Sequence, residues 1–256
     1  MDDNKMLSKV LKIGLWILIA AWFVVIMGFV SGEAEKVVCN RIEVTLSDTI
    51  LSRFVTRNDI RELLDESGIH LQGYPLVEIN TRRLERALEE NPYIRNAEVS
   101  KDISGKLEVT VDQRVPLIRI MPGGRKGFYL DKDGVILPLS EQFTPLIPLA
   151  SGNIAWPAAD GTLGDRLDEI YRFSSFMSEH PFWSDQIVQI YVNRSGEYEL
   201  IPRVGSHLIL LGSMNQWEKK LENLELLYRQ GFSKYGWNTY GIINLKYTNQ
   251  VICTKR

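Results

Sequence analysis

Residues able to do acid–base, nucleophilic or metal chemistry are few and widely separated in this sequence. It holds three histidines, His70, His180 and His207, and two cysteines, Cys39 and Cys253. None of these residues lies in an HExxH zinc motif or a CxxC pair, and no serine lies in a GxSxG turn. The sequence therefore predicts no catalytic residue, no cofactor and no metal ligand. His207 opens an apolar strand, where a structural histidine is the preferred interpretation over a ligand.

Two further clusters resemble ligand loops without meeting their requirements. Asp131, Asp133 and Gly134 suggest a calcium loop, but the glutamate that an EF-hand places at its twelfth position is missing. An Asp-Gly turn between two short apolar strands, over 128–137, is the preferred interpretation. The glycine-rich, basic stretch 123–127 lacks the spacing of a phosphate loop and predicts a hairpin tip.

A helix expected after Asn80 carries a dense set of charges of both signs. We expect a solvated face with ion pairs between residues four apart. The alternative is that its arginines bind an anionic ligand. The charged residues are Arg82, Arg83, Arg86, Glu85, Glu89 and Glu90.

Residues 13–32 contain no charged residue and include many large apolar side chains. Twenty helical residues span roughly the 30 Å core of a bilayer, so this run predicts one transmembrane helix. Lys5, Lys9 and Lys12 precede it, which predicts a cytoplasmic tail over 1–12 and an extracytoplasmic region over 33–256. A signal peptide cleaved near Gly32 is the alternative.

The composition excludes some classes of partner. The net charge is −2 and 24% of the residues are charged, whereas a nucleic-acid-binding protein usually carries a basic stripe. Cys39 and Cys253 lie at opposite ends of the extracytoplasmic region. A bridge is permitted in an oxidising compartment, but two independent thiols are the preferred interpretation.

The first part of this region predicts the order β-α-α-β-β. A strand over 37–44 precedes a helix with a capping box from Thr56 to Asp59 and a stop at Gly68. A second helix begins after Asn80 and ends before Pro92, and two strands with alternating apolar residues follow. The predicted core residues are Val44, Ile60, Leu84, Val99 and Val109.

The second part predicts a larger unit with an extended, mostly antiparallel sheet, so the fold class is α+β. After the hairpin, apolar periodicity predicts helices opening at Asp165 and Trp217. Predicted strands cover 187–192, 198–204 and 207–211, with a last single strand over 242–253.

Several motifs resemble known families. Residues 91–99, NPYIRNAEV, and 107–116, LEVTVDQRVP, resemble the two signatures of a POTRA (polypeptide-transport-associated) domain. Residues 127–134, 147–152, 210–228 and 243–247 resemble, in order, four motifs of the bacterial FtsQ/DivIB cell-division family. This resemblance implies a POTRA-type domain over 33–116 and an FtsQ-type β domain over 117–256.

The resemblance also implies a function. It implies a non-enzymatic scaffold in the cell inner membrane at the division septum, with its bulk in the periplasm. The implied partners are single-pass coiled-coil proteins of the FtsB/DivIC and FtsL types, through which septal peptidoglycan synthesis is controlled.

A partner strand pairing with an open edge formed by the last strand would supply affinity. The implied contact residues are Lys246, Tyr247, Asn249 and Val251. The alternative is a membrane-anchored, POTRA-containing transport or chaperone protein of the envelope.

Overall fold

The fold is seen in a computed structural model, which describes residues 14–23, 25, 37–47, 52–66, 71–123 and 126–256. These residues form two compact units. Unit 1 takes the described residues within Met1–Ser47 and Val55–Asp112, and unit 2 takes those within Asp48–Phe54 and Gln113–Arg256. The predicted tail, Gly68 and His70 lie outside the described residues.

The predicted transmembrane helix is only partly covered by this description. Residues 14–23 are helical, and their side chains are exposed. Residues 13, 24 and 26–32 of the predicted span lie outside the described part. Among the residues that are described, no helix is both long and apolar enough to cross a membrane.

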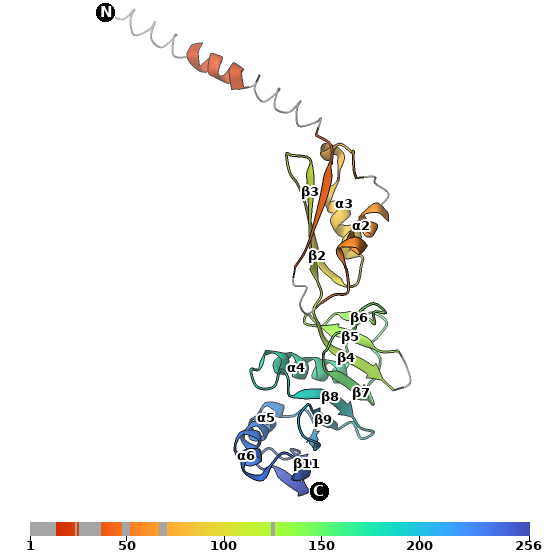
Figure 1. Ribbon diagram of the computed structural model, residues 1–256, viewed down its shortest axis with the longest axis vertical. Coiled ribbons are helices and arrows are strands. Elements are labelled where there is room, and N and C mark those ends of the chain that lie inside the picture. Colours follow the sequence, from red (N-terminus) through yellow and green to blue (C-terminus); the bar gives the residue numbers. More distant parts are fainter. Residues whose placement is uncertain (1–13, 24, 26–36, 48–51, 67–70, 124–125) are drawn as a thin grey trace, which may run out of the picture. The chain divides into compact units, whose positions relative to one another are not determined.

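Unit 1 has the predicted β-α-α-β-β order and forms a three-stranded sheet with strand order β1-β3-β2 (Figure 1). Strand β1 runs parallel to β3, and helices α2 and α3 lie against one face. Its elements are β1 Arg41–Ser47, α2 Arg57–Glu66, the 3-10 turn η1 Leu76–Glu78, α3 Thr81–Glu89, β2 Ile94–Lys101 and β3 Lys106–Gln113.

Both helices of unit 1 begin at capping residues that the sequence predicts. The Asp59 carboxylate accepts the backbone N–H of Thr56 at 2.7 Å, and the Thr56 hydroxyl accepts that of Asp59 at 3.3 Å. This confirms the predicted capping box. The Asn80 side chain accepts the Arg83 N–H at 3.2 Å, as expected of an N-cap.

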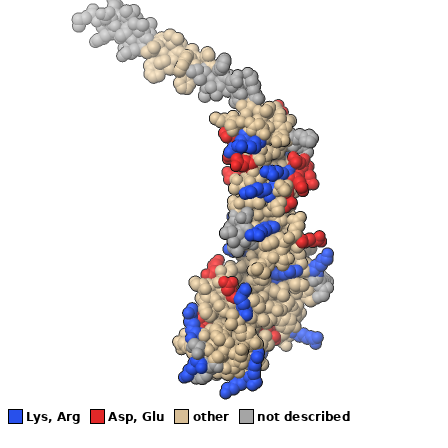
Figure 2. Space-filling model, viewed as in Figure 1, with Lys and Arg blue, Asp and Glu red and all other residues tan. Residues whose placement is uncertain are grey.

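The core of unit 1 contains all five predicted residues. Val44, Ile60, Leu84, Val99 and Val109 are buried. They come from both helices and all three strands, so this small sheet buries one face beneath its helices. Charged side chains of both signs are interspersed on the visible surface of each unit (Figure 2).

Unit 2 is built on a nine-stranded sheet of order β12-β11-β10-β9-β8-β7-β4-β5-β6. Five of its eight neighbouring pairs are antiparallel, and the pairs β10–β11, β4–β7 and β7–β8 are parallel. Its strands are β4 Pro116–Pro122, β5 Phe128–Asp131, β6 Ile136–Pro138, β7 Leu149–Gly152, β8 Ile187–Val192, β9 Tyr198–Pro202, β10 Leu208–Gly212, β11 Tyr240–Asn244 and β12 Ile252–Lys255.

The helices of unit 2 pack on this sheet through a continuous apolar core. Helix α4 spans Asp165–Glu179 and α5 spans Trp217–Leu226, as their periodicity predicted. A π-helical turn η2, Leu227–Gly231, and a short helix α6, Phe232–Tyr235, follow α5. Buried side chains of α4 and α5 join those of β4 and β8–β11 in one cluster.

The prediction of a single last strand over 242–253 is wrong. Two antiparallel strands, β11 and β12, occupy the ends of this stretch and are joined by a turn. The Asn244 side chain accepts the N–H of Lys246 at 3.0 Å, which closes an Asx turn directly after β11. The polar residues 246–250 therefore interrupt the apolar run. Strands β4 and β7 were not predicted as separate elements.

Candidate functional site

The predicted partner-binding residues lie on the β11–β12 hairpin at one edge of the large sheet. Asn244 is opposite Ile252 and Ile242 is opposite Thr254 in this hairpin. Strand β12 pairs with β11 on one side and, within the described part of the chain, has no strand on the other. Such an edge offers unpaired backbone N–H and C=O groups to a second chain.

Lys246 stands in the turn and is held by an ion pair. Its Nζ donates to both carboxylate oxygens of Glu197, at 2.9 and 2.7 Å. This hydrogen-bonded pair lowers the pKa of the Glu197 carboxyl from its ordinary value. Both side chains are more than a third exposed, so solvent screens the pair. The pair fixes where the Lys246 ammonium lies.

The neighbouring residues differ in how accessible they are. Tyr247 is 53% exposed, and Asn249 is also exposed. The backbone carbonyl of Thr248 accepts a hydrogen bond from the Asn223 side chain at 3.0 Å, which ties the turn to α5. Val251 is half-buried and packs against the core. The structure thus brings Lys246, Tyr247 and Asn249 together in an exposed turn and places Val251 beneath it.

Three further residues support this turn: Glu197, Gly212 and Asn223. Gly212 was predicted from the sequence only as the end of a strand, and Glu197 and Asn223 were not singled out. Gly212 has a φ of +75°, and a Cβ there would lie 3.0 Å from the Lys246 Cγ, so glycine suits this position. The sequence signal for it is the Leu-Gly pair ending β10. No local signal marks Glu197 or Asn223, since their partners are 49 and 25 residues away.

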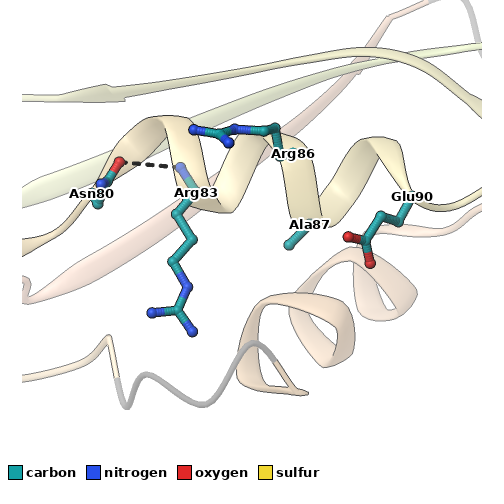
Figure 3. A pocket seen from close by; sticks show the side chains of 5 residues that line it. All are labelled: Asn80, Arg83, Arg86, Ala87 and Glu90. Carbon is teal, nitrogen blue, oxygen red and sulfur yellow. Dashed lines mark hydrogen bonds between the residues drawn. The ribbon is translucent and has the colours of Figure 1, made fainter.

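A groove of about 500 Å³ lies along α3 and is lined by Asn80, Arg83, Arg86, Ala87 and Glu90 (Figure 3). The Arg83 side chain extends away from the helix into it. Arg86 donates through Nε to the carbonyl of Arg82 in its own helix. No ion pair of these arginines is found among the described residues, so the predicted pairing with glutamates four residues away is not observed.

The glutamates of α3 instead contact strand β2. Glu85 accepts the backbone N–H of Val99 at 3.0 Å, and Glu89 accepts that of Ala97 at 3.3 Å. Because β2 is an edge strand of the small sheet, these N–H groups would otherwise have no strand partner. This edge is therefore closed by carboxylates.

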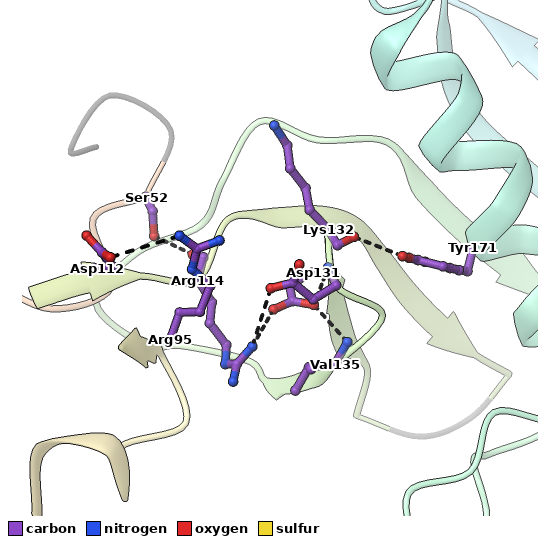
Figure 4. Close-up of polar contacts among 9 residues, drawn as sticks. Ser52, Arg95, Asp112, Arg114, Asp131, Lys132, Val135 and Tyr171 are labelled. Atoms are coloured by element: carbon purple, nitrogen blue, oxygen red, sulfur yellow. Dashed lines mark hydrogen bonds and ion pairs between the residues drawn. The ribbon is translucent and has the colours of Figure 1, made fainter. Parts of the chain in front are cut away.

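The Asp131 cluster is a turn, as predicted. One Asp131 carboxylate oxygen accepts the N–H groups of Asp133 and Val135, at 2.9 and 2.7 Å. The other accepts from the Arg114 guanidinium at 2.9 Å (Figure 4). Both oxygens of the Asp131 carboxylate are therefore used in contacts that stabilise the β5–β6 hairpin. Within the part of the chain that is described, no three His, Cys, Asp or Glu side chains gather as metal ligands.

The remaining reactive side chains are separated. Cys39 is buried in unit 1 and Cys253 half-buried in unit 2, both as free thiols, and burial raises the pKa of each. His207 is buried, with its Nε2 lying 2.7 Å from the Tyr228 hydroxyl. The hairpin edge offers backbone pairing and an exposed tyrosine rather than a reacting group.

Comparison with known proteins agrees with this architecture. The family described as FtsQ/DivIB, C-terminal related, matches residues 115–254, and the POTRA-like domain matches residues 37–112. The chain is also similar to the cell division protein FtsQ of Rhodothermus marinus, at 25% identity over 185 residues, which cover 70% of this chain and 67% of the relative. Since the C-terminal match spans more than half of its length, the chain belongs to the FtsQ/DivIB family.

Proposed function

We propose that this protein is a membrane-anchored, non-enzymatic scaffold of the bacterial division machinery. It binds partners of the FtsB/DivIC and FtsL types at the septum and so helps to control septal peptidoglycan synthesis. Family membership over residues 115–254 carries this proposal and favours it over an envelope transport role. The apolar run 13–32 supports anchoring in the inner membrane with the bulk periplasmic.

The proposed binding site is the edge of β12 together with the turn 245–251. A partner segment in an extended conformation pairs with the free edge of β12 and gains backbone hydrogen bonds there. Tyr247 then supplies an anchor, because a half-exposed tyrosine buries a large ring at little entropic cost. The Lys246–Glu197 pair holds the turn in register beside the edge.

The test is calorimetric titration of the full chain, in nanodiscs, with the extracytoplasmic segment of its FtsB/DivIC-type partner. We expect Tyr247→Ala to weaken binding by at least about 1 kcal/mol, as for a hot-spot residue. The thermal midpoint of unit 2 should stay unchanged, because Tyr247 makes no core contact.

Tyr191→Ala is the matched control. Tyr191 is 37% exposed on β8, four strands from β12 in the same sheet, and so about 19 Å away. We expect it to leave the affinity unchanged. Equal affinity of wild type and Tyr247→Ala would remove Tyr247 from the site. Absence of binding by the wild-type chain would contradict the scaffold proposal itself.

A further inference from the structure

We infer that the N-terminal end of unit 1 is a membrane-contact surface, where an apolar tip flanked by cations lies on the anionic lipid headgroups of the bilayer. The apolar tip consists of Val38, Tyr74, Val77 and Ile103. This inference rests on the proposed membrane anchoring and adds to it a second contact with lipid, made by the folded unit.

Three segments far apart in the sequence are joined at this end by backbone hydrogen bonds. Residues 37–40 lie in the middle. Leu76 N donates to Val37 O at 2.9 Å and Cys39 N donates to Tyr74 O at 2.8 Å. On the other side, Asn40 N donates to the carbonyl of Gly105 at 2.8 Å. The β2–β3 turn, residues 37–40 and η1 therefore form one end of the unit.

The apolar tip is exposed to an unusual degree. Ile103 is 93% exposed, and Val77 is 61% exposed. Val38 and Tyr74 are also exposed. All four lie on the three joined segments, so they gather at one end rather than scattering over the unit. Grouped exposed apolar side chains mark interaction sites, whereas single ones are ordinary.

Three cations lie next in sequence to two of the segments that form this tip. Lys101 ends β2, while Arg82 and Arg83 lie in the first turn of α3, directly after η1. All three are exposed, and none makes an ion pair within the described residues. Positive charge at a helix N-terminus opposes the helix dipole, so these arginines do not stabilise α3 in that position.

Acidic residues at the same end are Glu78 and Asp102. The Asp102 carboxylate accepts the Ser104 hydroxyl at 2.8 Å and so remains part of the β2–β3 turn. Lys106 at the start of β3 is already paired with Glu43 and Glu108. Arg82, Arg83 and Lys101 make no ion pair within the described residues, so they are the cations of this end that can contact lipid phosphates. Cations beside apolar and tyrosine side chains are the combination that favours a lipid interface.

The short connection between the apolar run and unit 1 favours lipid as the partner of this tip. Only residues 33–36 separate the apolar run 13–32 from Val37. A fully extended chain from Gly32 to Val37 reaches at most about 17 Å. When the run is inserted, the apolar tip is therefore restricted to the neighbourhood of the headgroups, and an anionic leaflet attracts its cations.

The test uses the full chain in nanodiscs whose lipids carry brominated acyl chains. In a Cys253→Ser background, Ile103→Cys is labelled with a bimane fluorophore, while native Cys39 is fully buried and stays unlabelled. Glu90→Cys is the matched control, since Glu90 is exposed at the opposite end of α3, about 13 Å along the helix.

We expect stronger quenching by brominated lipid at position 103 than at position 90. With phosphatidylglycerol present, quenching at position 103 should exceed that in pure phosphatidylcholine by about twofold. Arg82→Ser with Arg83→Ser should remove this lipid dependence. Equal, weak quenching at both positions in a chain that stays in the nanodisc would overturn the inference and leave the anchor intact. A chain that does not enter nanodiscs would overturn both proposals.

Discussion

His207 shows how a single buried side chain makes the stability of unit 2 depend on pH. Its Nε2 lies 2.7 Å from the Tyr228 hydroxyl, while its Nδ1 is buried without a partner in the described part of the chain. An imidazolium needs acceptors at both nitrogens. Burial, and to a lesser extent the nearby Arg256, therefore lowers the pKa of His207.

The sign of the pH dependence follows from this shift. Below the ordinary histidine value of about 6.5, the unfolded chain binds a proton that folded His207 does not. We expect the free energy of unfolding to fall as the pH is lowered from 7.5 to 5. Denaturant titrations of wild type and His207→Gln across this range measure the effect. The variant should show a shallower slope, and equal slopes would assign the dependence to other groups.

At the scale of elements, the accuracy of the sequence predictions depended on how local their signals were. The capping box at Thr56, the Asn80 cap and the alternating strand β3 were correct because each involves residues within one element. The prediction of a single last strand over 242–253 was wrong, because an Asx turn at Asn244 divides this stretch, which is apolar at both ends. Register and edge position depend on pairing between distant segments, which one sequence does not reveal.

The candidate site shows the same difference between local signals, which the sequence reveals, and long-range contacts, which it does not. Lys246 and Tyr247 were predicted as contact residues through a resemblance between motifs, and the structure places them in an exposed turn. Its supports Glu197 and Asn223 became visible only when the fold brought them within hydrogen-bonding distance. Similarly, the spacing of the glutamates on α3 fits ion pairs with arginines of the same helix as well as it fits contacts with a neighbouring strand. Only the packing of α3 on β2 assigns Glu85 and Glu89 to backbone N–H groups.

The contact between α3 and β2 predicts a local change in backbone protection. Replacing Glu85 and Glu89 by alanine removes the acceptors of the Val99 and Ala97 N–H groups. We expect faster amide hydrogen exchange at these two positions, because each N–H then faces solvent without a partner. Exchange at Val109 on the inner strand β3 should stay unchanged and serves as the internal control. Unchanged exchange at Ala97 and Val99 would mean that the carboxylates do not protect the edge.

At the scale of the whole molecule, the chain contains two cores. Leu84 is fully buried among the helices and strands of unit 1, and Ile209 is fully buried in the large sheet of unit 2. Each unit also has its own sheet, with three strands in unit 1 and nine strands in unit 2. Since folding cooperativity follows the packing of a core, each unit is expected to unfold as its own cooperative element.

This organisation predicts two separable thermal transitions in calorimetry of the full chain. Leu84→Ala removes buried methyl groups from unit 1 and should destabilise it by about 2–5 kcal/mol. For a unit of this size, each kcal/mol lowers the midpoint by about 4–8 °C. Only one transition should move, and Ile209→Ala should lower the other instead. If either substitution shifted both transitions equally, the two units would unfold as one, and the proposed partner-binding edge at β12 would depend on the stability of unit 1. Independent shifts would instead mean that substitutions at the proposed membrane-contact end of unit 1 leave the β12 edge intact.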